Sequence, residues 1–299
     1  LKFVNYSIGV DLKNTSYLSE SNNESSTAAA INYISVAIPT KVLSFSFGIK
    51  PKTSVGYLLE NDDKTQSIAE LNRFTGSGGI SNAFVSVGFE LFKNWGIGVS
   101  SSYAFGNLNH YHTKILENIE LYTRVSSESS VSGLDYNFST VYQKTFNNKT
   151  TLYTSIVYQP EANYKSKNNQ SISTINPNGS FGGDSEIIDL SAIGLNETNV
   201  KIPSSLSFGL GFGEDKKWYF GLNYLKTDEG GFKNELMALD NVEFKSSQTF
   251  SVGGFYLPKY DSFTNYLKTI TYRVGLRYKN GGLYVNDQQI NEIGLNFGF

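Results

Sequence analysis

The sequence predicts an all-β protein, a transmembrane antiparallel β-barrel of the outer membrane, from three observations. Apolar and small polar residues alternate with a period of two, aromatic residues and glycine are abundant, and short and long links alternate between the periodic stretches. The 299 residues include 20 Tyr, 21 Phe and 28 Gly but no Cys. Aromatic residues suit strands and the aromatic girdles of membrane barrels. We therefore expect one barrel domain over residues 1–299.

The stretch "WGIGVSSSYAFG" shows the alternation most clearly. Trp95, Val99 and Tyr103 share one face of an extended chain, and the opposite face carries Gly98 and Ser102. The first face suits lipid, and the second suits a polar or lightly packed lumen.

A soluble β-sandwich or barrel is the alternative, because alternation alone does not say which face meets lipid. A soluble sheet would carry many Lys, Glu and Asp residues on its polar face. Here the polar faces consist mostly of Gly, Ser, Asn and Thr, and the charges gather in the links. The pattern therefore favours the membrane.

No run of about 18 apolar residues exists in the sequence, which excludes a transmembrane helix. The mean hydropathy of −0.28 is compatible with a membrane barrel, because only alternate side chains of each strand meet lipid. The net charge of −2 argues against a nucleic-acid partner. The absence of cysteine excludes disulfides and thiol chemistry.

About twelve stretches have the alternation of membrane-crossing strands. Tight turns at "PTK", "FKN", "FNNK" and "GEDKK" separate four pairs of them. Trp95 and Trp218 each begin a stretch just after such a turn, which predicts that both lie at one membrane interface. The twelve stretches cover residues 4–13, 28–38, 43–50, 85–91, 95–106, 134–139, 152–158, 206–212, 218–224, 250–252, 272–278 and 293–299.

The other links are predicted to be longer and polar. One is the charged segment "ENDDKTQ", and another is a loop of about twenty residues from Leu108 on. The polar stretch from Glu161 to Thr198 includes Ile187 to Leu195, which can extend a strand beyond the membrane. The link "LPKYDSFTNYLK" is expected to contain a short helical turn.

Four blocks of the sequence resemble the Bacteroidota branch of the FadL-like outer-membrane transport proteins. They are "FGIKPKTSVGY", "GSGGISNAFVSVGFELFKNWGIGVSSSYAFGN", "KIPSSLSFGLGFGEDKKWYFGLNY" and "YRVGLRYKNGGLYVNDQQINEIGLNFGF". The resemblance implies a barrel of fourteen strands with an N-terminal hatch that moves hydrophobic compounds such as long-chain fatty acids. The sequence shows no hatch segment before Leu1 and about twelve strands. We expect either that a hatch and a last hairpin lie outside it, or that both are lost, in which case a plugged-channel mechanism would be in doubt.

The resemblance also implies a lateral opening at a kink in the third strand. That strand contains Lys50, Pro51, Lys52, Thr53 and Ser54. Pro51 has no N–H to donate to a neighbouring strand, so a local break in the ladder is expected there. The alternative is a strand that merely bends where it leaves the bilayer. A ladder that continues through Pro51 would argue against the opening.

Residues for metal or acid–base chemistry are scarce. His110 and His112 are the two histidines, and they are predicted to lie in a solvated loop without the further ligands that a metal site needs. The segment "TGSGG" at residues 75–79 lacks the lysine and the following helix of a phosphate-binding loop, and we expect a bulge or bend there. We expect no cofactor, no metal and no enzymatic activity.

Charged residues on the predicted lumen faces are of both signs, so they can pair with one another inside the barrel. Their pairing accounts for them as well as ligand binding would. They are Asp11, Lys13, Lys50, Glu90, Arg273, Arg277 and Glu292.

Two functions fit the sequence. The first is a channel or transporter for hydrophobic small molecules, and the alternative is an accessory barrel of a larger outer-membrane assembly or secretion complex. A site for a hydrophobic ligand should place large apolar residues on the lumen face. That face is mostly Gly, Ser and Asn, with Phe84, Tyr153 and Tyr219 as exceptions. The sequence therefore favours transport over the accessory role only narrowly. The expected partners are outer-membrane lipid, a hydrophobic ligand and other outer-membrane proteins.

Overall fold

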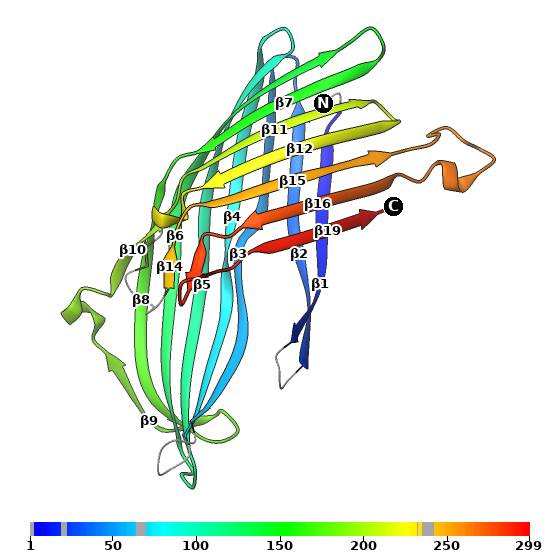
Figure 1. Cartoon of the computed structure of the whole chain (residues 1–299). Helices are drawn as coiled ribbons and strands as arrows, with labels where there is room; N and C mark the ends of the chain where they lie inside the picture. Colours follow the sequence, from blue (N-terminus) through cyan, green and yellow to red (C-terminus); the bar gives the residue numbers. More distant parts are fainter. Residues whose placement is uncertain (1–2, 19–22, 64–69, 232, 235–241) are drawn as a thin grey trace.

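The computed structural model describes residues 3–18, 23–63, 70–231, 233–234 and 242–299, and nearly all of them lie in antiparallel strands (Figure 1). A 16-stranded sheet contains a main path in which each strand pairs with the next. The path is β1 (Asn5–Leu18), β2 (Asn23–Pro39), β3 (Leu43–Asp63), β4 (Glu70–Phe92), β5 (Trp95–Leu116), β6 (Tyr122–Thr145), β7 (Thr150–Gln159), β11 (Ser205–Glu214), β12 (Trp218–Thr227), β15 (Ser247–Tyr256), β16 (Tyr272–Asn280) and β19 (Glu292–Gly298).

The remaining elements branch from this path. In the large sheet they are β8 (Ala162–Ile175), β9 (Phe181–Ile188), β10 (Glu197–Ile202) and β13 (Lys233–Asn234). A small second sheet contains β14 (Val242–Phe244), β17 (Leu283–Val285) and β18 (Gln288–Gln289). The 3-10 helices are η1 (Leu190–Ile193), η2 (Glu229–Gly231) and η3 (Tyr266–Lys268). Within the described residues, no helix has the length and apolar character needed to cross a membrane.

Strand length divides the sheet into two regions. β7, β11, β12 and β15 have 10 residues each, which is the length of a tilted strand that crosses a bilayer. β3, β4, β5 and β6 have 21, 23, 22 and 24 residues. At about 3.3 Å per residue, these four strands extend well beyond the bilayer. They form the long wall in the lower part of Figure 1.

The two faces of the main path differ as the alternation predicts. Large apolar side chains are exposed on one face, where lipid can cover them. On the opposite face Asn82, Ser102 and Asp135 are buried, so this face lines the interior. The exposed apolar residues include Phe47, Ile49, Val85, Val99, Tyr103, Leu134, Phe138, Ile156, Phe208, Leu222, Phe250, Val274 and Leu295.

One end of the sheet carries the short links 40–42, 93–94, 146–149 and 215–217, together with the longer link 257–271. We call it the short-turn end. Trp95 and Trp218 begin β5 and β12 directly after two of these turns, as expected for an interface girdle. Figure 1 shows both marked chain ends near it. Outer-membrane barrels place short turns in the periplasm, so we expect the long wall to face outward.

β1 and β19 are the two ends of the main path, and no pairing joins them among the described residues. The path has the twelve strands that the sequence predicts. Closure into a barrel and a total of fourteen strands stay predictions. Closure is physically required in lipid, because an unpaired strand edge leaves backbone groups without partners.

Several predicted links are wrong in detail. β5 continues to Leu116 and β6 begins at Tyr122, so the loop of about twenty residues from Leu108 does not exist. The strand proposed at Ile187–Leu195 ends at Ile188 and is followed by η1. The predicted helical turn is present as η3. Alternation continues into the long wall with fewer large apolar residues than in the membrane strands, which is why the sequence understated these lengths.

The "TGSGG" segment, where a bulge or bend was predicted, lies inside β4. Gly78 has a φ of +113°, a conformation that side-chain-bearing residues rarely adopt. A Cβ at this position would also lie 2.1 Å from the Asn107 carbonyl oxygen of β5. Glycine is therefore required here by both conformation and close packing.

The orientation of the barrel can be tested with introduced cysteines, since the chain has none of its own. Glu120→Cys lies in the link between β5 and β6, and Asn147→Cys lies in a short turn; both positions are exposed. We expect a membrane-impermeant maleimide to label Glu120→Cys on intact cells. Asn147→Cys should react only after the outer membrane is permeabilised. The reverse pattern would contradict the assignment of the short turns to the periplasm.

Candidate lateral opening and lumen site

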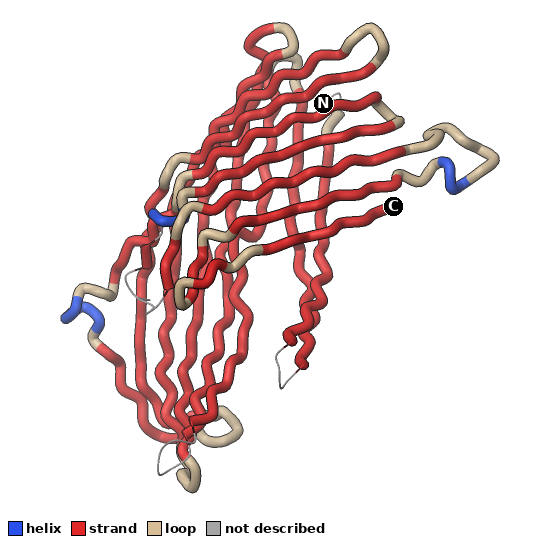
Figure 2. The backbone as a smooth tube through the Cα atoms, in the orientation of Figure 1, coloured by secondary structure: helices blue, strands red, loops and turns tan. Residues whose placement is uncertain are grey.

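β2 and β3 separate at the position that the sequence singled out. Their pairing runs from Pro39 and Ser44 to Ile34 and Ile49 and ends there. Both strands stay extended beyond this point, β2 with β1 as its partner and β3 with β4. Figure 2 shows the β1–β2 hairpin standing apart from the lower part of the wall.

The proline explains why the pairing stops. In the register of the β2–β3 ladder, Pro51 comes two residues after Ile49, the last paired residue of β3. Pro51 cannot donate a hydrogen bond and is therefore suited to an unpaired edge. The β1–β2 register also shifts between Gly9 and Val10, close to the same height. Irregularities on both strands thus accompany their separation.

The ladder between β3 and β4 continues through Pro51 with one bulge. Pro51 is opposite Ser81, and Thr53 is opposite Ile80, so Lys52 is the extra residue. A bulge redirects the side chains around it. Lys50 and Lys52 both line a lumen cavity. The ladder is therefore continuous on one side of β3 and interrupted on the other, and a lateral opening at residues 50–54 stays a prediction.

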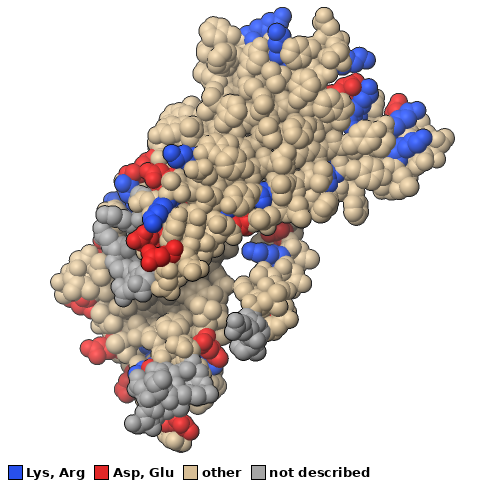
Figure 3. Space-filling model, in the orientation of Figure 1, with Lys and Arg blue, Asp and Glu red and all other residues tan. Residues whose placement is uncertain are grey.

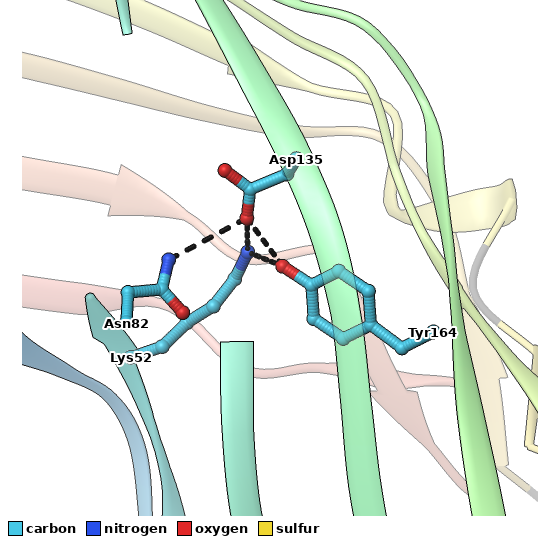
Figure 4. A network of polar contacts seen from close by, with 4 residues as sticks. All are labelled: Lys52, Asn82, Asp135 and Tyr164. Atoms are coloured by element: carbon cyan, nitrogen blue, oxygen red, sulfur yellow. Dashed lines mark hydrogen bonds and ion pairs between the residues drawn. The ribbon is translucent and has the colours of Figure 1, made fainter. Parts of the chain in front are cut away.

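Lys52 belongs to a network of polar contacts inside the barrel (Figure 4). Its ammonium lies 2.6 Å from Oδ2 of Asp135 on β6 and also donates to the hydroxyl of Tyr164 on β8. That hydroxyl donates to the same carboxylate oxygen, and so does the Asn82 amide of β4, at 3.4 Å. The Asp135 side chain is 2 % exposed. Four strands are thus joined at one carboxylate.

The network borders β8 and β10, which extend the sheet beyond the long part of β6: β8 pairs with β6, and β10 pairs with β8. Tyr164 of β8 and Val200 of β10 are opposite each other in that pair. Both pack in one apolar cluster with residues from the inner face of the wall, namely Ile80, Ala104 and Val131. A Cβ at Gly133 would lie 2.9 Å from the Cα of Tyr164, so β8 approaches the backbone of β6 closely at this point.

A cavity of about 820 Å³ lies on the membrane side of the network. Most of its lining is Ser, Gly and Asn, together with Lys50, Lys52 and Asp135. Oδ1 of Asn82 is buried and has no hydrogen-bond partner within the described part of the chain. This oxygen can accept a hydrogen bond from a molecule in the cavity. The lining suits water or a polar group better than an alkyl chain.

A second cavity, of about 660 Å³, lies along β7, β11, β12, β15 and β16. Its lining includes many glycines and the predicted inward aromatics Tyr153 and Tyr219, whose ring centroids are 5.9 Å apart. The third inward aromatic, Phe84, lies under the Lys50 ammonium at 5.7 Å. Among the predicted lumen charges, Arg277 and Glu292 pair at 3.8 Å.

The histidines were placed wrongly in a loop, because both lie in β5 within the long wall. His110 Nδ1 is 2.9 Å from the Tyr57 hydroxyl, and partial burial lowers the pKa of His110. His112 Nε2 is 2.7 Å from Oδ1 of Asn72, and its ring stacks on that of Phe74 at 4.4 Å. No group of three or more potential metal ligands occurs in the described ranges. These contacts hold neighbouring strands together.

Sequence reasoning missed Asp135 and Tyr164 as members of a lumen site. Asp135 alternates with apolar residues in the predicted stretch 134–139, but nothing in the pattern connected it with Lys52. β8 lies in a polar stretch whose alternation is weak, so the sequence analysis did not identify it as a strand. The available signal for this strand was the segment "ANYKSKNN", which lies between two short apolar segments.

The extended antiparallel sheet, with its apolar outward face and its polar interior, is typical of the class of membrane β-barrels. The sequence matches the BamG family over residues 1–299, so the chain belongs to this family. A search of curated protein sequences found no match.

Two solved structures resemble this one in fold. The monoaromatic hydrocarbon channel CymD gives a TM-score of 0.57 at 12% sequence identity and covers 99% of this chain and 78% of its own. The ΔS2S3 mutant of the monoaromatic hydrocarbon channel TodX gives 0.53 at 14% identity, with coverages of 96% and 75%. At these identities the likeness concerns the fold. It agrees with the fold that the FadL-like resemblance implied.

The Lys52–Asp135 contact should contribute measurably to stability. Asp135→Ala leaves a lysine ammonium facing the interior without its counter-charge, and we expect a loss of about 3 kcal/mol in the free energy of unfolding. Urea unfolding of the barrel in lipid vesicles measures it. Glu197→Ala, which removes an exposed partner 4.0 Å from Lys167, is the control and should cost less than about 1 kcal/mol.

A double variant separates charge from packing. Lys52→Met combined with Asp135→Leu removes both charges, and it should recover most of the stability that Asp135→Ala loses. Equal losses for Asp135→Ala and Glu197→Ala would show that the buried contact has no special role.

Proposed function

We propose that this protein is a barrel subunit of a larger outer-membrane protein assembly in a Gram-negative bacterium. The observation that carries the proposal is the character of the lumen. The 820 Å³ cavity beside the Lys52–Asp135 contact is lined mainly by small polar residues and charges. A path for hydrophobic molecules needs large apolar side chains along its length.

The long wall also supports a role in assembly. β3 to β6 extend far beyond the bilayer. Each has 21 to 24 residues, which is longer than a strand needs to be to cross the bilayer. Large surfaces outside the membrane suit contacts with other proteins. A β-barrel assembly or protein-secretion apparatus is the kind of machine that would use such a subunit. Membership of the BamG family is compatible with this role.

Transport of hydrophobic small molecules, such as fatty acids, is the second candidate. The separation of β2 from β3 beyond Ile49 favours it, since a gap in the wall is the exit that lateral release needs. The fold is also that of channels for monoaromatic hydrocarbons. In this case the lumen would have to guide an apolar molecule past Lys50 and Lys52. Assignment to the Bacteroidota branch of FadL-like proteins remains a prediction.

Native mass spectrometry of the protein extracted from its own outer membrane in mild detergent tests the assembly role. We expect a complex in which the barrel is present with other proteins in fixed stoichiometry. Release of the barrel as an isolated species with a bound lipid-sized adduct would overturn the proposal and favour transport.

A proline substitution tests the second candidate separately. Pro51→Thr restores an N–H group and allows the β2–β3 ladder to continue past Ile49. If the gap releases substrate, uptake of a radiolabelled long-chain fatty acid should fall to the level of cells without the barrel. Pro39→Thr, at the paired end of β2, is the matched control and should leave uptake unchanged. Uptake that is unaffected by removal of the barrel would exclude this candidate.

A further inference from the structure

The link between β15 and β16, residues 257–271, differs from its neighbours at the short-turn end. The other links there are the turns 40–42, 93–94, 146–149 and 215–217. This link has its own fold, in which Asn265 Oδ1 caps η3 by accepting from the Leu267 N–H at 3.1 Å. The Lys259 N–H donates to the Lys268 carbonyl at 2.8 Å and closes its base. Figure 1 shows it projecting beyond the adjacent turn.

Contacts with the barrel fix the direction in which the link projects. The Leu257 N–H donates to the Lys217 carbonyl of the β11–β12 turn at 2.6 Å. In the same turn, the Lys216 ammonium lies 4.6 Å from the ring centroid of Tyr260. The Tyr272 hydroxyl of β16 donates to the Leu267 carbonyl at 3.1 Å. The link is therefore a preformed surface, and a partner would not have to order it.

This surface is strongly apolar. Phe263 is 100 % exposed, Tyr266 80 % and Leu267 62 %. These residues lie beyond the aromatic row of Trp218, Tyr256 and Tyr272, which pair side by side at the strand ends and mark the interface. They are thus outside the hydrocarbon layer. Clustered apolar side chains in water indicate a contact with another molecule.

Charge identifies the kind of partner. The five links at this end contain seven lysines and two carboxylate side chains, and all of these groups are exposed. Lys259 and Lys268 lie in the link itself, with Asp261 as its one acidic residue. Figure 3 shows blue side chains along this end. An acidic surface would be attracted to it.

We propose that residues 257–271 are a docking site for a periplasmic protein whose surface has an apolar pocket bordered by carboxylates. Phe263 and Leu267 enter the pocket, and Lys259 and Lys268 face the carboxylates. The inference rests on the proposed subunit role and adds to it the place and chemistry of one contact. Because the link projects away from the bilayer, protein rather than inner-leaflet lipid is its occupant.

Photo-crosslinking in living cells tests this proposal. A benzoylphenylalanine replaces Phe263, and the matched control replaces Phe146, an exposed phenylalanine in the β6–β7 turn at the same end. We expect a discrete protein adduct from position 263 and none from position 146. Mass spectrometry of the adduct should identify a periplasmic segment that contains apolar and acidic residues. An adduct only with lipid, or with an outer-membrane protein, would overturn the proposal.

Charge reversal provides the second measurement. With the probe at position 263, Lys259→Glu together with Lys268→Glu should reduce the adduct about tenfold, because both contacts become repulsive. Lys41→Glu together with Lys93→Glu, in turns of other strands, should leave it unchanged. Heat-modified migration in gels checks that each barrel is folded. An adduct that is insensitive to the first pair would overturn the charge argument.

The outcome separates this inference from the proposed function. If the barrel is extracted in a complex that Phe263→Ser does not alter, the subunit role stands and the docking site is wrong. If the barrel is extracted alone and without adducts, both fail. Loss of one periplasmic component on Phe263→Ser, with the outer-membrane components retained, supports both.

Discussion

Every backbone N–H and C=O in a bilayer needs a partner within the protein, and this constraint determines most of the structure. Along the main path each strand pairs with the next, and the constraint would require β1 and β19 to be paired as well. It also explains the alternation, because a sheet that spans a membrane presents alternate side chains to lipid and to the lumen. The exceptions are informative for the same reason. The pairing of β2 with β3 ends at Ile49, two residues before Pro51.

Beyond the bilayer, water can hydrogen-bond to exposed strand edges, so a strand of the long wall can have an unpaired edge there. β3 to β6 continue there with partners on each side for most of their length, while the free edge of β3 begins at Lys50. The bulge at Lys52 lies at this transition and directs its ammonium toward Asp135. One irregularity thus connects the change in pairing with the polar contact that joins four strands.

The sequence was sufficient for the class of fold, for twelve strand positions and for the tight turns, because those features depend on residues close together in the chain. It also located Pro51, whose missing N–H is a local property. It was insufficient for the lumen site, since Lys52, Asp135 and Tyr164 are brought together by strand register and by the pairing of β8 with β6. The long-wall strands were understated because Ser, Asn and Thr alternate with few large apolar residues there. His110 and His112 looked like loop residues for the same reason.

The detour of the chain through β8 to β10 has a consequence for the order of folding. β7 pairs with β11, yet residues 160–204 separate them, whereas most pairs on the path are joined by a single turn. Hairpins such as β4–β5 and β11–β12 can form early, because their loops are short and cost little entropy to close. Joining β7 to β11 requires a long loop to be closed first, which slows non-local pairing. The chain is therefore expected to assemble as two meanders, with the seam at Gln159 and Ser205 closing late.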